Sequence, residues 1–129
     1  YVKQNDAELA ASFERHFDTK DALEEAAREL IAELGAKGAL ITRGEKGMML
    51  FLADGARHEI PVSEKSEVYD VSGAGDTCVA AFILALAGGA LPLAAAQLSN
   101  IASGIAVRKF GTATVSAAEL TRKVRELSV

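Results

Sequence analysis

The sequence has little of several residue types on which whole classes of protein depend. Among 129 residues there is no tryptophan, and there are two histidines, two prolines and one cysteine. One cysteine cannot form an internal disulfide, so a disulfide framework is excluded and a reducing cytoplasm is the expected location. The two histidines, His16 and His58, are isolated and lack the spacing of zinc ligands.

Long hydrophobic runs and basic clusters are missing too. The longest apolar run, from Cys78 to Leu91, is shorter than the roughly 20 residues of a membrane span, and Gly88 and Gly89 interrupt it. The 14 Lys and Arg against 18 Asp and Glu give a net charge of -4, without a basic run that would follow a nucleic-acid backbone. We expect neither a membrane nor nucleic acid as partner. The chain begins at Tyr1 within a strand-like segment, which predicts a piece of a longer protein.

What is present, 50% hydrophobic and 25% charged residues, is typical of one globular domain. Apolar periodicity and turn residues predict an α/β fold with a mainly parallel sheet, helices on both faces and a β-hairpin. The helix from 77 to 87 is apolar on every side, so we expect it to be enclosed. The expected helices cover about 5–13, 18–35, 77–87, 92–110 and 116 onward, and the expected strands cover 39–42, 48–52 and 57–61, the last two joined through Asp54 and Gly55.

The most informative stretch runs from Val68 to Thr77, a short strand that leads into a glycine turn and a helix. Glycines at a helix start leave backbone amides uncovered, and such amides bind anions, phosphate above all. Asp76, in the first helical turn, would be kept ionised by these amides and could accept a proton from an attacking hydroxyl. From these residues alone, a glycine turn in which Asp76 merely caps the helix stays open.

This stretch does not match two other nucleotide-binding motifs. The dinucleotide fingerprint needs a third Gly or Ala, where this chain has Cys78, and an acidic residue about 20 positions later. No Asp or Glu occurs between Thr77 and Ala118, so a hydride-transfer domain is disfavoured. The P-loop needs Gly-Lys followed by Ser or Thr, and the chain has no Gly-Lys pair, which excludes an ordinary P-loop ATPase.

Residues 70–77, Asp-Val-Ser-Gly-Ala-Gly-Asp-Thr, resemble the signature of the ribokinase-like, or PfkB-type, carbohydrate kinases. Residues 5–8 are similar to the family's Asn-x-x-Glu motif, residues 42–47 to its nucleotide loop, and Asn100 lies where an adenine-side Asn is expected. Within the family, residues 68–77 and 110–116 look most like the kinase domain of bifunctional heptose-7-phosphate kinase and heptose-1-phosphate adenylyltransferase enzymes.

The resemblance implies that residues 1–129 are the C-terminal, nucleotide-binding part of a three-layer α-β-α kinase domain, without its sugar-binding part and lid. The implied reaction is ATP-dependent phosphorylation of a sugar phosphate, with heptose 7-phosphate in ADP-heptose and lipopolysaccharide synthesis as the leading substrate. Another sugar, a nucleotide-binding or assembly module without turnover, and a fragment that binds nothing stay open. We also expect self-association, because a truncated domain exposes apolar surface and a sheet edge.

The resemblance also implies roles for individual residues. Asp76 would be the catalytic base, and the amides of Gly73, Ala74 and Gly75 would form the anion hole. From the residues alone, capping by Asn5 and Glu8 and a satisfied polar role for Asn100 stay open. The implied ligands are ATP (Asn5, Thr42, Gly44, Gly47 and Asn100), Mg²⁺ (Asn5 and Glu8) and a monovalent cation such as K⁺ (Asp70, Ser72, Gly111 and Ser116).

Overall fold

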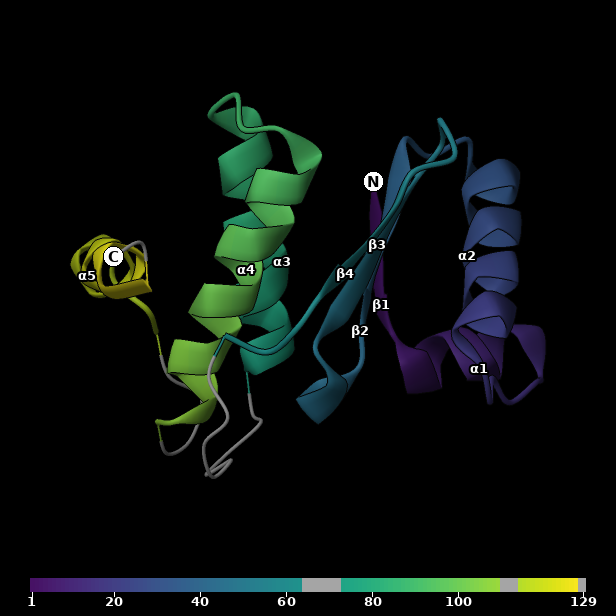
Figure 1. Cartoon of the computed structure of the whole chain (residues 1–129), viewed down its shortest axis with the longest axis horizontal. Coiled ribbons are helices and arrows are strands. Elements are labelled where there is room, and N and C mark those ends of the chain that lie inside the picture. Colours follow the sequence, from purple (N-terminus) through teal and green to yellow (C-terminus); the bar gives the residue numbers. More distant parts are fainter. Residues whose placement is uncertain (64–72, 110–113, 128–129) are drawn as a thin grey trace. The chain divides into compact units, whose positions relative to one another are not determined.

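The computed structural model describes residues 1–63, 73–109 and 114–127, which form two compact units, Tyr1–Pro61 and Val62–Val129 (Figure 1). No helix among these residues is long and apolar enough to cross a membrane.

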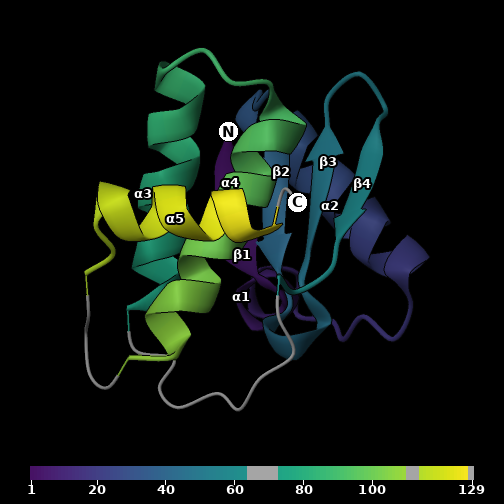
Figure 2. The same cartoon turned by 60° about the vertical axis from the view of Figure 1, so that its left-hand side comes forward.

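The first unit is built on a four-stranded sheet in the order β1-β2-β3-β4. Strand β1 pairs parallel with β2, whereas β2 with β3 and β3 with β4 are antiparallel. The sheet is therefore mixed in the described part of the chain, where we expected it to be mainly parallel, because two of its three pairings, β2–β3 and β3–β4, are antiparallel. The expected β3–β4 hairpin is confirmed (Figure 2). The strands are β1 (Val2–Asn5), β2 (Gly38–Thr42), β3 (Met48–Leu52) and β4 (Arg57–Ile60).

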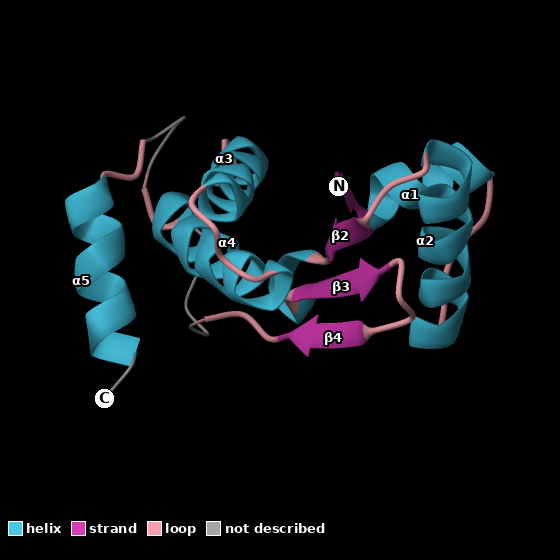
Figure 3. Ribbon diagram, turned by 90° about the horizontal axis from the view of Figure 1, so that it is seen from above, coloured by secondary structure: helices cyan, strands magenta, loops and turns pink. Residues whose placement is uncertain are grey.

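Two helices, α1 (Asp6–Phe13) and α2 (Lys20–Leu34), lie on one side of this sheet (Figure 3). The Thr19 hydroxyl caps the start of α2 by accepting a hydrogen bond from the amide of Ala22, and Gly35 ends the helix with a φ of 60°. The apolar stripe of α2 packs on the sheet as its periodicity predicts. The resulting core contains Leu9, Leu23, Ala26, Ala27, Leu30 and Ile31 from the helices and Ala39, Ile41, Met49 and Phe51 from the strands.

The second unit contains α3 (Ala74–Ala87), α4 (Pro92–Val107) and α5 (Ala117–Leu127). Helices α3 and α4 pack side by side. Small residues of α4, such as Ala95, Ala102 and Ala106, are buried and permit close packing. Helix α4 ends before the expected residue 110, because the amides of Arg108 and Lys109 bond to carbonyls three residues earlier and so close a tighter last turn.

The expectation that α3 is enclosed on all sides is wrong. Cys78 and Phe82, four residues apart on one face of the helix, are buried. Val79, Ile83 and Leu84, on the neighbouring face, are 39%, 50% and 71% exposed. Among the described residues α3 is therefore buried along one face, and an apolar sequence does not by itself provide a covering partner for the other. The buried Cys78 fits a structural thiol.

Candidate active site

The residues that the resemblance singles out fall in both units, and the first group lies at the end of the first unit's sheet. One row of paired residues crosses this end, from Asn5 through Thr42 and Met48 to Ile60. Asn5 and Thr42 are the last residues of the two parallel strands, so the structure brings them side by side at the carboxyl ends, where ligands bind in open α/β sheets.

Asn5 and Glu8 form a reciprocal cap at the start of α1. The amide of Glu8 donates to Oδ1 of Asn5 at 2.7 Å, and the amide of Asn5 donates to Oε2 of Glu8 at 2.8 Å. The capping role that stayed open in the sequence is therefore present. The cap also fixes the direction of the Glu8 carboxylate, whose Oε1 has no partner among the described residues. Oxygen ligands of this kind suit a magnesium ion that keeps several waters.

The loop after β2 is tied to itself by backbone hydrogen bonds and contains the short helix η1 (Gly44–Lys46). The amide of Arg43 donates to the Gly47 carbonyl at 2.8 Å, and the amide of Gly47 donates to the Gly44 carbonyl at 3.1 Å. Gly44 and Gly47 have φ values of 57° and 84°. A Cβ at Gly47 would also collide with the Ile60 carbonyl and lie 2.9 Å from Cα of Pro61, so this position requires glycine.

The second group lies at the start of α3. Gly73 precedes the helix with a φ of 78°, and the first intrahelical bond runs from the amide of Thr77 to the Gly73 carbonyl at 2.9 Å. The helix starts at Ala74, which places Asp76 at its third position, in the first turn as expected. The amides of Ala74, Gly75 and Asp76 make no hydrogen bond to described residues, as expected for a helix start that no side chain caps.

The Asp76 side chain is exposed and makes no hydrogen bond or ion pair within the described residues. It makes no capping hydrogen bond to its own helix, so its local structural role is limited to the favourable interaction of a first-turn carboxylate with the helix dipole. Asn100 on α4 is only 8% exposed and is not without a partner, and its place beside adenine stays a prediction.

Ser116 caps the start of α5. Its amide donates to Oε1 of Glu119 at 3.2 Å, and the amide of Glu119 donates to its hydroxyl at 3.1 Å. Lys109 lies across this start, with Nζ 2.7 Å from the Thr114 carbonyl and 2.6 Å from Oε2 of Glu119. The hydrogen bond from Lys109, and then that from the Ser116 amide, hold the pKa of Glu119 below its ordinary value.

The predicted monovalent-cation residues Asp70, Ser72 and Gly111 lie outside the described residues, so their role stays a prediction. Within the described ranges, no group of three or more His, Cys, Asp or Glu side chains could hold a metal by itself.

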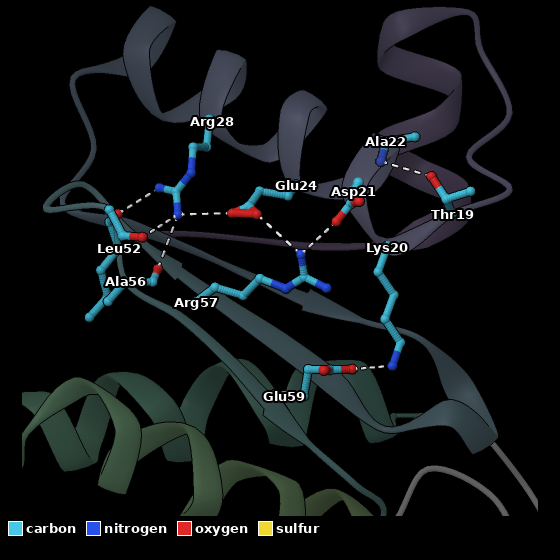
Figure 4. A network of polar contacts seen from close by, with 11 residues as sticks. Thr19, Lys20, Asp21, Ala22, Glu24, Arg28, Leu52, Ala56, Arg57 and Glu59 are labelled. Atoms are coloured by element: carbon cyan, nitrogen blue, oxygen red, sulfur yellow. Dashed lines mark hydrogen bonds and ion pairs between the residues drawn. The ribbon is translucent and has the colours of Figure 1, made fainter.

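Sequence reasoning missed a polar network between α2 and the hairpin (Figure 4). The Arg28 guanidinium donates to the carbonyls of Leu52 at 2.9 Å and Gly55 at 2.8 Å, while Arg57 contacts Asp21 at 3.0 Å and Glu24 at 3.2 Å. The hydrogen bonds to Asp21 and then Glu24 raise the pKa of Arg57. The partners are 24 to 36 positions apart in sequence, so no local pattern could have revealed the network.

Comparisons with known proteins agree with these motifs. The model of the pfkB family of carbohydrate kinases matches residues 1–119. The bifunctional protein HldE of Rhodospirillum rubrum is 46% identical over 125 residues, which cover 97% of this chain and 25% of that protein. HldE of Coxiella burnetii is 45% identical over 113 residues, which cover 88% of this chain and 24% of that protein. The chain thus spans about a quarter of the length of these relatives.

Solved structures show the same fold. The chain is similar to Arabidopsis thaliana ribokinase complexed with ribose and ATP, with a TM-score of 0.87 and 23% identity over 96% of this chain and 40% of that one. For Escherichia coli phosphofructokinase-2 in complex with potassium, the TM-score is 0.86 and the sequence identity is 24%, over 99% of this chain and 41% of that one. For Thermotoga maritima ribokinase, the TM-score is 0.82 and the sequence identity is 28%, over 97% of this chain and 42% of that one. These likenesses confirm the ribokinase-like α/β fold class, and the match to the family model shows that this chain belongs to the pfkB family of carbohydrate kinases.

Proposed function

We propose that this chain is the nucleotide-binding, C-terminal part of an ATP-dependent sugar kinase and that Asp76 is its catalytic base. One observation carries the proposal. At the start of α3, three backbone amides without partners among the described residues lie next to an exposed carboxylate that no described group engages. Unpaired amides at a helix start attract phosphate, and a carboxylate beside them that makes no hydrogen bond within the described residues is free to accept a proton.

In the proposed reaction, Asp76 takes the proton of the sugar hydroxyl as the hydroxyl oxygen forms a bond to the γ-phosphorus of ATP. The bond between that phosphorus and the bridging oxygen breaks, and ADP leaves with its electron pair. The amides of Gly73, Ala74 and Gly75 hold the charge on the phosphoryl oxygens in transit. Such fixed donors suit phosphoryl transfer, which depends mainly on positioning and charge stabilisation.

The first unit and the remaining predicted residues would hold the nucleotide and the cations. Asn5 and Glu8 would hold Mg²⁺ through its waters, and bound Mg²⁺ would neutralise phosphate charge. Thr42, Gly44 and Gly47 would line the ribose and phosphates, while Asn100 would contact the adenine. Backbone oxygens around Asp70, Ser72, Gly111 and Ser116 would hold a monovalent cation, for which the potassium complex of E. coli phosphofructokinase-2 is a precedent.

The substrate proposed first is heptose 7-phosphate, converted to the 1,7-bisphosphate in cytoplasmic ADP-heptose synthesis. The support is the identity of about 45% to proteins named HldE, against 22–28% to ribokinases, phosphofructokinase-2 and other sugar or adenosine kinases. Another sugar is the alternative, because the chain spans only about a quarter of the length of these relatives.

The test uses the full-length protein with Asp76→Asn, which preserves size and removes the charge. We expect kcat for sugar phosphorylation to fall by roughly 10²- to 10⁴-fold, the usual contribution of a general base. The dissociation constant for ATP with magnesium should change little. Asp18→Asn, an exposed carboxylate before α2, is the matched control and should keep normal kcat. A near-normal kcat in Asp76→Asn would contradict the proposed base.

A second candidate is a module that binds nucleotide without turnover, which the span of about a quarter of its relatives favours. Calorimetry of the 129-residue chain with ATP and magnesium, together with a phosphorylation assay, separates the two. Binding without turnover supports the module for the isolated chain, whereas turnover by the chain alone excludes it.

A further inference from the structure

A side chain of α4 holds the backbone at the start of α3. The hydroxyl of Ser103 donates a hydrogen bond to the Ala74 carbonyl at 3.4 Å. Both residues are half-buried, and the two helices pack side by side. Because Ala102 and Ala106 of α4 are small and buried, the helices approach closely enough for so short a side chain to reach across. Helix α4 thus contacts the very turn of α3 that carries the proposed anion hole.

The bonded carbonyl of Ala74 and the amide of Gly75 belong to one rigid group. The peptide bond between them is planar and trans, so its C=O and N–H point in opposite directions. The carbonyl faces Ser103, whereas Gly75 is exposed and its amide has no partner among the described residues. A contact that fixes the carbonyl therefore also fixes the direction of the Gly75 N–H, one of the proposed anion-hole donors.

The hydrogen bond from Ser103 affects this peptide in two ways. It restrains the peptide plane in the first helical turn, where the amides have no helical partners. It also polarises the peptide group, because hydrogen bonds in a chain strengthen one another. At 3.4 Å the bond is longer than the roughly 2.5–3.0 Å that is usual for a hydroxyl donor, and bonds of this kind often tighten only in the reacting complex. Its effect should therefore fall on the reaction rate more than on nucleotide affinity.

We propose that Ser103 is a positioning residue of the kinase: through the peptide between Ala74 and Gly75, its hydroxyl aims the Gly75 amide at the phosphoryl group in transit. This role rests on the proposed anion hole and does not require Asp76 to be the base. No side chain caps the start of α3, and Gly73 before it has a φ of 78°. The local sequence therefore supplies no side chain that orients these amides, and the contact from α4 takes that place.

The test compares Ser103→Ala with Ser103→Thr in the full-length protein by steady-state kinetics of sugar phosphorylation. Ser103→Ala should lower kcat by roughly three- to tenfold, the effect of one lost neutral hydrogen bond, and should leave KM for ATP nearly unchanged. Alanine is the better helix former, so a weakened α4 would not explain the fall. Ser103→Thr keeps the hydroxyl and should restore most of kcat.

Thr121→Val is the matched control. It removes a hydroxyl that bonds within its own helix, to the Ala117 carbonyl of α5 at 2.7 Å, and should keep normal kcat.

Three results would overturn the role of Ser103: a normal kcat in Ser103→Ala, a rise in KM for ATP in place of the fall in kcat, or equal falls in Ser103→Ala and Ser103→Thr. Gly75→Val crowds the amide itself and should lower kcat further than Ser103→Ala. A normal kcat in Gly75→Val would contradict the proposed anion hole and the role of Ser103 together. A low kcat in Gly75→Val beside a normal one in Ser103→Ala would overturn the role of Ser103 alone.

Discussion

At the scale of single residues, the candidate site depends on backbone conformations that only a few residue types adopt. Gly44 and Gly47 in the loop after β2 both have positive φ, yet their surroundings differ. The space around a Cβ at Gly44 is open, whereas at Gly47 it is filled by the chain at residues 60 and 61. Gly47 therefore combines a collision with a backbone conformation, φ 84° and ψ -139°, that residues with a side chain adopt only at a cost.

This difference predicts unequal effects of alanine at the two positions. Gly44→Ala should reduce the free energy of unfolding by about 1 kcal/mol, the usual cost of a left-handed residue with a side chain. Gly47→Ala should cost clearly more, because Ile60 and Pro61 must also move. Urea denaturation of both variants measures the difference, and equal losses would contradict the close approach of the loop to β4.

The contact between Lys109 and Glu119 predicts a pH dependence at the start of α5. Because the folded state lowers the pKa of Glu119, its contribution to stability is present above the ordinary value of 4.5 and is lost as pH falls through the lower folded pKa. In Lys109→Gln the carboxyl pKa should rise toward the ordinary value. An NMR titration of the Glu119 side chain measures this shift, and an unchanged titration would exclude Lys109 as its main cause.

At the scale of elements, local sequence patterns predicted most helix and strand boundaries. The features that these patterns did not predict depend on contacts between residues far apart in the sequence. The cap of Asn5 and the turn at Asp54 and Gly55 lie where the sequence placed them, because each acts on backbone within a few residues. The exposed face of α3 was not predictable, since what covers an apolar helix is decided by other elements. The same holds for the polar network around Arg28 and Arg57, whose partners lie 24 to 36 positions away in the sequence.

The polar network around Arg28 predicts how the hairpin is held on α2. Arg28→Met keeps much of the apolar stem but leaves the carbonyls of Leu52 and Gly55 without their donor. We expect a loss of roughly 1–3 kcal/mol in the free energy of unfolding, the usual cost of removing hydrogen bonds to a charged group. Chemical denaturation measures this loss in the free energy of unfolding. Arg122→Met, on an exposed turn of α5, is the control, and an equally small loss in both would contradict the network.

At the scale of the whole molecule, the exposed apolar side chains of α3 bear on the expected self-association. Exposed clusters of this kind promote association in water. We predict that the 129-residue chain forms dimers or larger species and that Leu84→Lys shifts them toward monomer in sedimentation velocity. Leu34→Lys, at another exposed leucine on α2, should have little effect. A strictly monomeric chain at high concentration would contradict the prediction.

The central claim, that Asp76 acts as the base of a sugar kinase, is tested most directly by one pre-steady-state measurement of the first turnover. Full-length protein saturated with ATP and magnesium is mixed with excess heptose 7-phosphate in a rapid-quench instrument. The ADP formed in the first turnover is then measured against time. We predict that the rate of this step falls by roughly 10²- to 10⁴-fold in Asp76→Asn while ATP still saturates the enzyme at the normal concentration. An unchanged first-turnover rate in the variant would contradict the account.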